Sequence, residues 1–436
     1  MSALTEYLQN KSILILGMGR EGRSSLRFLQ THVPSARIAV ADRNDPHIAG
    51  VPGHFGADYL AHLGEYDVVL KSPGIPFVGV EHPSGTEITC QTDLFLRFAD
   101  CVSVGITGTK GKTTTSTLVH EILDAADVPN ALIGNIGVPV LDVFDDITGK
   151  VAVIELSCHQ LEFMRVSPHI AIFTNLYPEH LDHYDGFAGY AAAKLHIAAY
   201  QTKDDVFIYG DVEGLREFLA DKPLPAKQVP IGYDHGKGDP FLTRLAGCNA
   251  RLVGKHNAQN TFFAAEAARA LGVSEDAIEQ GVRRFGGIEH RMEPVGTFKG
   301  IAFVNDSIAT APEVVLLELE ALGNVDTLLF GGLDRGLDYT QFVDALCESG
   351  VRNLIGLPQT GHAICDAVSA RGTDKTVYKA SDMDDAVRAA YRYTKTGKTC
   401  LFSPAAASYN VYKNFEEKGR HFKSLVRQYG GENDGV

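Results

Sequence analysis

Residues 104–115, with the sequence Val-Gly-Ile-Thr-Gly-Thr-Lys-Gly-Lys-Thr-Thr-Thr, constrain the fold more than any other part of this chain. The apolar run 101–106 predicts a buried strand, and the small residues after it allow backbone N–H groups to face anionic oxygens. A helix that opens near Lys112 directs its positive end to the same place. We expect Lys112 to neutralise the β- and γ-phosphates of a nucleoside triphosphate and Thr113 to offer a hydroxyl to Mg²⁺. The expected nucleotide-binding loop comprises Gly108, Thr109, Lys110, Gly111, Lys112, Thr113 and Thr114.

The spacing of this loop departs from the common Walker pattern, because Ile106 stands where that pattern has its first glycine. The alternative interpretation is a plain strand-to-helix turn. Glycines, a lysine and three threonines directly after an apolar strand disfavour it.

Composition sets outer limits on the class of protein. A length of 436 residues predicts about three domains, and a formal charge of −14 argues against a nucleic-acid or anionic-membrane partner. The seven cysteines include no C-x-x-C pair, which favours reduced thiols in a cytosol. No apolar run approaches the ~20 residues of a membrane span, and no secretory signal pattern opens the sequence. We therefore expect a cytoplasmic protein without membrane insertion, and a monomer is favoured.

The N-terminal part predicts a βαβ unit. An apolar strand over 12–16 runs into the turn Gly17-Met18-Gly19-Arg20-Glu21-Gly22 and a helix, and a second strand ends at Asp42. Taken alone, this G-x-G-x-x-G pattern supports a dinucleotide-dependent dehydrogenase, but the same turn serves any diphosphate-bearing ligand. Arg20 is expected either to pair with a phosphate or to be a solvated charge at the helix start. Asp42 is expected to accept from a ribose hydroxyl or a uracil N–H, or to cap the strand end.

A metal site is expected beside the phosphate loop. The apolar run 151–154 delivers Glu155 to the end of a strand, and Mg²⁺ prefers such hard oxygen ligands next to phosphate. Further on, His180, Asp182 and His183 resemble a transition-metal cluster, but no H-E-x-x-H helix or cysteine ligand accompanies them. Lys194, on a helix of small residues, is expected either to bind phosphate or to be converted to an anion.

Several motifs, in order along nearly the whole chain, resemble those of the Mur ligase family. They include G-x-x-G-T-x-G-K-T-T, E-L-S-x-x-Q, H-R-x-E, N-D-S-x-A-T and S-P-A-x-A-S. These enzymes are ATP-dependent, amide-forming ligases of bacterial cell-wall precursors, and folylpolyglutamate synthases are their relatives. The resemblance implies an α/β fold of three domains: a Rossmann-like UDP-precursor domain (1–97), a P-loop ATPase-type domain (98–288) and a Rossmann-like amino-acid domain (289–436). Alternating strands and helices after residue 300 agree with a further doubly wound sheet.

The resemblance also implies roles for individual residues. Glu155, His180 and a carbamylated Lys194 would hold two Mg²⁺ ions, for which Mn²⁺ can substitute, and Lys112 would be catalytic with them. The precursor would be bound by Arg20, Glu21, Asp42, Arg43, Ser72, Pro73, Gly74, Asn135, Ser157 and Gln160. ATP would be contacted beyond the loop by Asn257, Asn260, Arg291 and Asp306. An N-terminal helix cap is the alternative role for Asn257.

Within the family, the C-terminal motifs are similar to those of the branch that joins D-glutamate to UDP-N-acetylmuramoyl-L-alanine. Thr310, Arg335, Ser408 and Phe415 would then contact the amino acid. Ile308 stands where part of that branch has a lysine, so recognition must depend on other groups, and the fork of Arg335 could grip a carboxylate. The D-N-P-R signature of the branch that adds a diamino acid is absent. The rival interpretations are a folylpolyglutamate-type ligase, a dinucleotide oxidoreductase and a non-catalytic nucleotide sensor.

Overall fold

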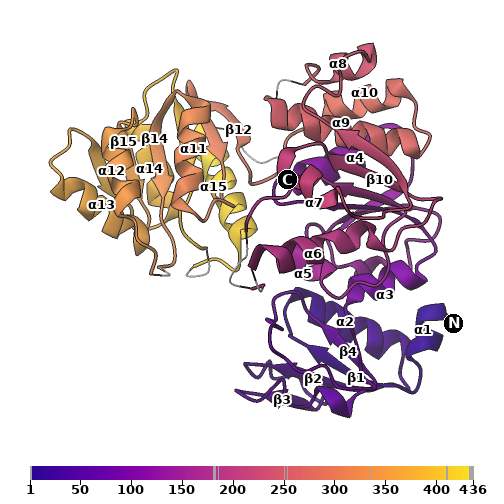
Figure 1. Ribbon diagram of the computed structural model, residues 1–436. Coiled ribbons are helices and arrows are strands. Elements are labelled where there is room, and N and C mark those ends of the chain that lie inside the picture. The colour runs from indigo at the N-terminus through magenta and orange to yellow at the C-terminus, as the bar shows by residue number, and fades with distance from the viewer. Residues whose placement is uncertain are drawn as a thin grey trace. The chain divides into compact units, whose positions relative to one another are not determined.

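The computed structural model describes residues 2–179, 183–184, 186–249, 251–252, 254–334, 336–408 and 411–431. The chain divides into two compact units, residues 1–286 and 287–436 (Figure 1). Within the described residues, the first unit holds two separate sheets and the second unit holds one. The division of the first unit into two domains at residue 97 stays a prediction.

The first sheet has the strand order β3-β2-β1-β4-β5, and all of its strands are parallel. Its strands are β1 (Ser12–Leu16), β2 (Arg37–Asp42), β3 (Gly53–Phe55), β4 (Val68–Lys71) and β5 (Glu87–Thr89), with helices α1 (Ala3–Leu8), α2 (Arg20–His32), η1 (Leu63–Glu65) and α3 (Gln91–Phe98). Leu16 at the end of β1 lies in register with Ala41 and with Lys71. The carboxyl ends of β1, β2 and β4 therefore meet at one edge, which is where open α/β sheets bind ligands.

The second sheet has the order β11-β10-β9-β6-β8-β7, again all parallel. Its strands are β6 (Val102–Thr107), β7 (Asn130–Gly134), β8 (Val151–Glu155), β9 (Ile170–Phe173), β10 (Val206–Gly210) and β11 (Lys227–Ile231). Its helices are α4 (Lys112–Ala125), η2 (Val140–Val143), α5 (Cys158–Leu161), α6 (Gly186–Ala199), α7 (Glu213–Leu219), α8 (Pro240–Leu245), α9 (Lys255–Ala270) and α10 (Glu275–Arg284). Helix α4 packs against α9 and α10 (Figure 1). Strand β8 is buried along its whole length, as expected for a parallel strand covered on both faces.

The second unit contains one sheet of order β12-β13-β17-β14-β15-β16. Strand β12 is antiparallel to β13, and the other pairs are parallel. The strands are β12 (Glu293–Phe298), β13 (Ile301–Asn305), β14 (Val325–Phe330), β15 (Asn353–Gly356), β16 (Thr376–Lys379) and β17 (Thr399–Phe402). The helices are α11 (Pro312–Leu322), α12 (Thr340–Glu348), α13 (Thr360–Ala370), α14 (Met383–Tyr393) and α15 (Phe415–Gly430). Two all-parallel sheets and a third sheet that is parallel except for β12 confirm the predicted α/β class.

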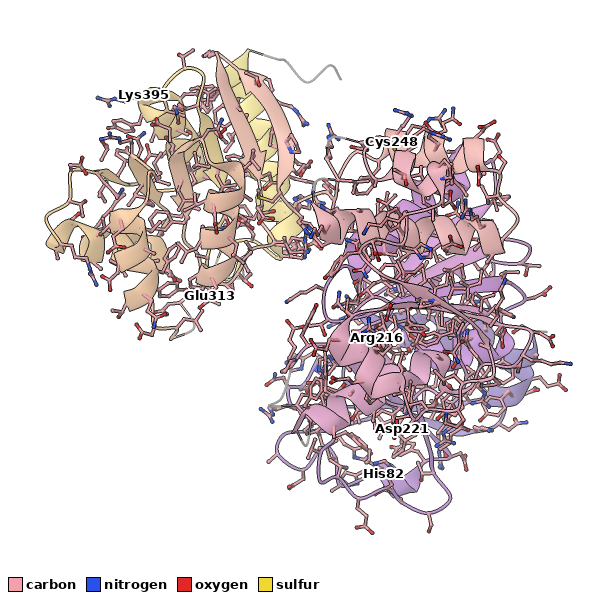
Figure 2. All side chains as sticks on the ribbon, turned by 45° about the horizontal axis from the view of Figure 1, so that its top comes forward. His82, Arg216, Asp221, Cys248, Glu313 and Lys395 are labelled. Carbon is pink, nitrogen blue, oxygen red and sulfur yellow. The ribbon has the colours of Figure 1, made fainter. Side chains whose placement is uncertain are left out.

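Charged side chains cover the outside of each unit. Lys395 and Glu313, for example, are exposed on the second unit (Figure 2). In the described part of the chain, no helix is both long enough and apolar enough to cross a membrane.

Candidate nucleotide-binding and ligase site

The phosphate loop joins β6 to α4, and its neighbours shape it. Gly111, directly before the helix, has a φ of 88°, which lies in the left-handed region that favours glycine. A Cβ at this position would come within 2.6 Å of Oδ1 of Asn260. On another side of the loop, the backbone carbonyl of Asn175 accepts from the Thr109 N–H at 3.0 Å, and its Oδ1 accepts from the Lys110 N–H at 2.9 Å. The loop is thus held in one shape at a helix N-terminus, where unpaired N–H groups bind anions.

Two lysines from different helices converge on this loop. Nζ of Lys112 donates to the carbonyl oxygen of Gly108 at 2.8 Å and to that of Thr109 at 3.1 Å. Nζ of Lys194 in α6 donates to the same Gly108 oxygen at 2.9 Å. Burial, followed by the charge of Lys112, lowers the pKa of Lys194 to about 7, and burial also lowers the pKa of Lys112. A neutral amine is therefore readily available at Lys194 near neutral pH.

The remaining loop residues have distinct environments. Thr113 and Thr114 are half-buried in the first turn of α4. Lys110 is exposed, and its Nζ donates to Oε1 of Glu179 at 2.7 Å. The buried hydroxyl of Thr109 lies 3.0 Å from the hydroxyl of Tyr190 in α6. Tyr190 is a contact that the sequence reasoning missed, and its position one helical turn before Lys194 is the signal that could have revealed it.

Glu155 ends β8 with its side chain almost completely buried. One carboxylate oxygen, Oε1, accepts from Nδ2 of Asn135 at 2.6 Å. Within the described residues, the other oxygen, Oε2, is buried and has no hydrogen-bond partner. Leaving a buried carboxylate oxygen unpaired is costly, so this atom fits a cation that binds between Glu155 and the phosphates.

Asn257 and Asn260 lie on one face of α9, as expected from their spacing. Nδ2 of Asn260 donates to Oδ1 of Asn257 at 3.3 Å, and Oδ1 of Asn260 accepts from the Thr115 hydroxyl at 3.3 Å. The residue that precedes the first turn of α9 is Gly254, so Asn257 is not the N-cap and that alternative is wrong. The asparagine pair therefore lies against the start of α4.

The loop after β7 connects the precursor-side residues. The guanidinium of Arg20 donates to the carbonyl oxygens of Gly134 at 3.1 Å and of Asn135 at 2.9 Å. Arg20 is exposed and opens α2, and its role toward a phosphate stays a prediction. These two hydrogen bonds hold the guanidinium beside the glycine-rich turn.

Gln160 links the segment after β8 to the glycine-rich turn. Its Nε2 donates to Oε1 of Glu21 at 2.7 Å, and its Oε1 accepts from the backbone N–H of Ser157 at 2.9 Å. The Ser157 hydroxyl in turn accepts from the Gln160 N–H, which completes a capping box at the start of α5. Burial raises the pKa of Glu21. Glu21, Ser157 and Gln160 therefore support one another through hydrogen bonds.

The glycine-rich turn itself is tied to the neighbouring strand ends. Oδ2 of Asp42 accepts from the Met18 N–H at 2.7 Å, and the Ser72 hydroxyl donates to the Gly17 carbonyl at 2.7 Å. A Cβ on Gly22 would overlap the Gly17 carbonyl oxygen, which explains the glycine there. Arg43 and Gly74 are exposed and Pro73 is half-buried at the same edge. The sequence-predicted residues of the first sheet are therefore brought together.

The histidine-rich segment is described only in part. His180 and Asp182 lie outside the described residues. Nε2 of His183 lies 3.5 Å from Oε2 of Glu162, and the same oxygen accepts from Nζ of Lys71 at 3.3 Å. Burial lowers the pKa of Lys71. The sequence alone did not single out this lysine as a site residue. The sequence feature that could have indicated it is a lysine directly after the apolar run 68–70.

In the second unit, Asp306 follows β13 and is buried. Its Oδ1 accepts from the Met292 N–H at 3.0 Å, and burial raises its pKa to about 7. Arg291 and Thr310 are exposed. Asp306 is therefore a carboxyl group that exchanges its proton near neutral pH.

The predicted amino-acid residues occupy the carboxyl-terminal part of this unit. Ser408 is buried, and its hydroxyl has no hydrogen-bond partner among the described residues. Phe415 opens α15 and packs edge-on against His290, with ring centroids 5.9 Å apart. Arg335 lies outside the described residues. Lys418, which sequence reasoning missed, is buried and donates to the Gly331 carbonyl at 2.8 Å, and burial lowers its pKa to about 7.

The fold and this site define a class of protein: an α/β nucleotide-binding enzyme with a buried carboxylate at the end of β8 and a buried lysine in α6 beside its phosphate loop. The Mur ligase middle domain family matches residues 106–268. The UDP-N-acetylmuramoylalanine--D-glutamate ligase of Symbiobacterium thermophilum is 33% identical over 94% of this chain and 97% of its own length. The UDP-N-acetylmuramoyl-L-alanine--L-glutamate ligase of Salinispora tropica is 34% identical over 97% of this chain and 99% of its own length. The chain belongs to the Mur ligase family.

Solved structures of Mur ligases share the fold. The UDP-N-acetylmuramate-alanine ligase MurC of Thermotoga maritima aligns with a TM-score of 0.57 at 17% identity, covering 97% of this chain and all of that one. The MurF ligase of the same organism, in complex with ADP, gives a TM-score of 0.57 at 14% identity, covering 98% of this chain and all of that one. The resemblance inferred from the sequence motifs is confirmed.

Proposed function

We propose that this chain is an ATP-dependent ligase that joins D-glutamate to UDP-N-acetylmuramoyl-L-alanine during synthesis of the peptidoglycan precursor. The observation that carries the proposal is the similarity, over nearly the whole length, to the ligase of Symbiobacterium thermophilum whose name gives these two substrates. The phosphate loop with Lys112, Glu155 and Lys194 around it supports an ATP-dependent step.

The chemistry requires activation, because a carboxylate does not react with an amine at a useful rate. The alanine carboxylate of the precursor attacks the γ-phosphorus of ATP, the bond to the β-phosphate oxygen breaks, and an acyl phosphate and ADP form. The amine of glutamate then attacks the acyl carbon, inorganic phosphate leaves, and the amine loses a proton as the amide forms. Lys112 stabilises the negative charge that develops on the transferred phosphoryl group.

The residues beside the loop fit Mg²⁺. The unpaired Oε2 of Glu155 and the hydroxyl of Thr113 would hold one ion, and His180 with a carbamylated Lys194 would hold the second. When bound, the ions supply charge neutralisation for the phosphate oxygens, and Mn²⁺ can substitute for Mg²⁺. The lowered pKa of Lys194 supports the carbamate, because the neutral amine is the form that combines with CO₂.

Each substrate is assigned to its own set of residues. We assign the UDP end of the precursor to the edge of the first sheet, with Arg20, Glu21, Asp42, Arg43, Ser72, Pro73 and Gly74, and the alanyl end to Asn135, Ser157 and Gln160. Asn257, Asn260, Arg291 and Asp306 are assigned to ATP. Thr310, Arg335, Ser408 and Phe415 are assigned to glutamate.

The test is release of inorganic phosphate from ATP with each substrate present or omitted, and with D- and L-glutamate compared side by side. We expect rapid release only when ATP, the UDP-linked alanine precursor and D-glutamate are all present. Preference for L-glutamate would instead match the relative from Salinispora tropica, and reaction with a folate substrate would match a folylpolyglutamate-type ligase. Absence of phosphate release with either enantiomer would overturn the proposal and favour a nucleotide sensor.

We place the reaction in the cytoplasm, where ATP and UDP-linked precursors are made. Each of the seven cysteines is a free thiol in the structure, which agrees with a reducing compartment.

A further inference from the structure

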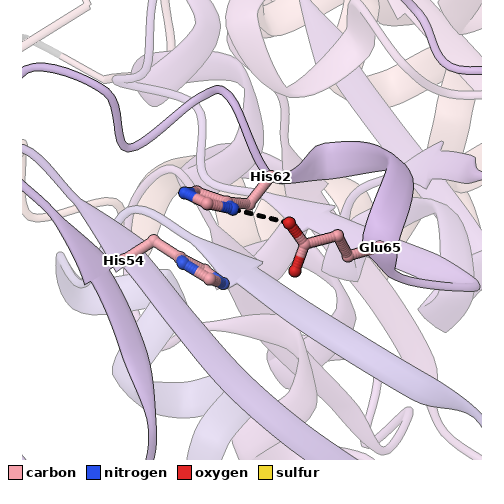
Figure 3. Close-up of side chains that lie close together, drawn as sticks. All are labelled: His54, His62 and Glu65. Atoms are coloured by element: carbon pink, nitrogen blue, oxygen red, sulfur yellow. Dashed lines mark hydrogen bonds and ion pairs between the residues drawn. The ribbon is translucent and has the colours of Figure 1, made fainter.

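Two histidines and a glutamate form a compact group in the first unit, on elements that do not carry the nucleotide site. His54 lies on β3, the edge strand of the first sheet, His62 precedes the 3₁₀ turn η1, and Glu65 is the last residue of that turn. One candidate ligand atom from each side chain lies within 4.8 Å of the other two. In Figure 3 the imidazole rings stack, and the Glu65 carboxylate lies at the same end of both rings. The ring centroids are 3.8 Å apart with an interplanar angle of 12°.

The local backbone explains why these side chains meet. In a 3₁₀ turn, residues three positions apart are eclipsed, so His62 and Glu65 lie over each other. Nδ1 of His62 is 2.7 Å from Oε1 of Glu65 as a result. Leu63, between them, is buried in the apolar core and anchors the turn.

His54 is anchored from a different direction. Its strand pairs with β2 through the register His54–Ala41. Its Nε2 is 2.8 Å from the hydroxyl of Tyr66, the residue that follows η1. Outer partners of this kind orient the ring of a ligating histidine. Both histidines are half-buried, so they are accessible to an ion from solvent yet restrained.

The donor set selects the kind of cation. Two imidazole nitrogens and one carboxylate oxygen suit borderline divalent metals such as Zn²⁺, whereas Mg²⁺ and Ca²⁺ prefer oxygen ligands throughout. Ligands about 2.0–2.2 Å from a tetrahedral Zn²⁺ lie roughly 3.3–3.6 Å from one another. The ligand atoms lie at most 4.8 Å from one another, and at least one imidazole ring must turn out of the stack for both rings to bind the same ion.

We propose that His54, His62 and Glu65 form a binding site for one Zn²⁺-like transition-metal ion, separate from the magnesium site of the ligase reaction, with water completing the coordination. Such an ion joins the edge strand β3 to η1. Because Phe55 in β3 is in register with Asp42 in β2, the ion also stabilises the strand pair next to the glycine-rich turn.

The principal test is calorimetric titration of Zn²⁺ into untagged, chelator-treated protein. His54→Ala, His62→Ala and Glu65→Gln are compared with wild type. The matched control is His47→Ala, because His47 is an exposed histidine that lies 3.2 Å from Asp45. We expect one Zn²⁺ site in wild type, from which millimolar Mg²⁺ does not displace the ion. The Zn²⁺ affinity should fall at least tenfold or be lost in each histidine variant, fall less in Glu65→Gln and stay unchanged in the control. Equal Zn²⁺ affinity in wild type and both histidine variants would overturn the proposal.

A second measurement does not depend on substituted protein. Histidine acylation by diethyl pyrocarbonate, mapped by mass spectrometry, should decrease at His54 and His62 when Zn²⁺ is added and should remain unchanged at His47. Electron paramagnetic resonance of added Cu²⁺ should show two coordinated nitrogens in wild type. Unprotected His54 and His62 at saturating Zn²⁺ would also reject the site.

Discussion

Lys112 and Lys194 donate to the same oxygen, the carbonyl of Gly108, at 2.8 and 2.9 Å. The two side chains come from α4 and α6, so two amines meet at one point of the phosphate loop. Two cations this close repel each other, and burial adds to the cost of both charges. Burial, followed by the repulsion from Lys112, lowers the pKa of Lys194 to about 7, and the two lysines therefore have different tasks.

Lys112→Ala is expected to lower turnover by about a hundredfold or more while the fold survives, because a charge that stabilises the transition state is lost. Phosphate release measured at saturating substrates gives the change, and circular dichroism checks the fold. Lys203→Ala is the control, since Lys203 is exposed. Turnover equal to that of the control would remove Lys112 from the mechanism.

Glu155→Gln is expected to raise the Mg²⁺ concentration needed for half-maximal activity by about tenfold or more, because one anionic ligand becomes a neutral amide. Glutamine keeps an oxygen that can accept the hydrogen bond from Asn135, so the loop should remain in place. A Mg²⁺ titration of the activity measures the effect, with the exposed Glu213→Gln as the matched substitution. An unchanged Mg²⁺ requirement would mean that the unpaired oxygen of Glu155 has another purpose.

Lys194 is expected to carry a carbamate whose population rises with pH at constant dissolved CO₂. The reacting form is the neutral amine, and with a pKa of about 7 its fraction increases between pH 6 and pH 8. ¹³C NMR with labelled CO₂ measures the adduct, and short carboxylates should partly restore activity to Lys194→Ala. An unmodified lysine with metal and nucleotide bound, together with no rescue, would show that the second ion is held in another way.

Arg335→Ala is expected to raise the KM for glutamate by roughly ten- to a hundredfold, which corresponds to a charge-assisted hydrogen bond of about 1.5–3 kcal/mol. Ile308 cannot hold a carboxylate, so the loss should not be compensated at that position. The KM values for ATP and for the precursor should stay near those of wild type. Arg352→Ala, which removes an exposed arginine paired with Asp374 at 3.4 Å, is the control. Equal increases for all three substrates would indicate a structural role for Arg335.

Asp306→Asn is expected to change how the stability of the ligand-free protein depends on pH. The folded-state pKa of about 7 exceeds the value of about 3.9 in an unfolded chain. Between these values the folded state holds a proton that the unfolded state has released, so this group makes the free energy of unfolding fall as pH rises from about 4 to 7. Asparagine stays neutral and can still accept from the Met292 N–H. Differential scanning calorimetry should therefore show a Tm difference, variant minus wild type, that grows over this interval, whereas a constant difference would argue against the raised pKa.

The elements that carry the site could be predicted from local patterns. The strand expected over 12–16 is β1, with the same bounds. The strand expected over 101–106 is β6, which is displaced by one residue, and the strand expected over 151–154 is β8, which is one residue longer. Continuous apolar runs that end in glycines or a carboxylate are local features, and local steric and hydrogen-bonding preferences suffice to place them. The motif sequence likewise predicted the family, because the residues that contact phosphate and metal recur at short, fixed spacings.

Contacts between distant segments could not be predicted in this way. Two sets of hydrogen bonds depend on how the two sheets within the first unit pack. Arg20 donates to the carbonyls of Gly134 and Asn135, and Gln160 donates to Glu21. The buried Lys71 ends β4 and the buried Lys418 lies in the first turn of α15, and neither carries a stronger signal in the sequence. Their burial follows from what the rest of the chain places around them.

The sequence by itself determined the α/β class, the phosphate loop and the family, because these depend on residue order over a few positions. Only the tertiary structure decided which groups share one point in space. It placed Asn260 against Gly111, left one oxygen of Glu155 unpaired, and brought His54 within reach of His62 and Glu65. The physical reason is that desolvation depends on burial and the Coulomb interaction depends on the distance between charges. Spacing along the chain gives neither the burial of a side chain nor its distance from residues far away in the sequence.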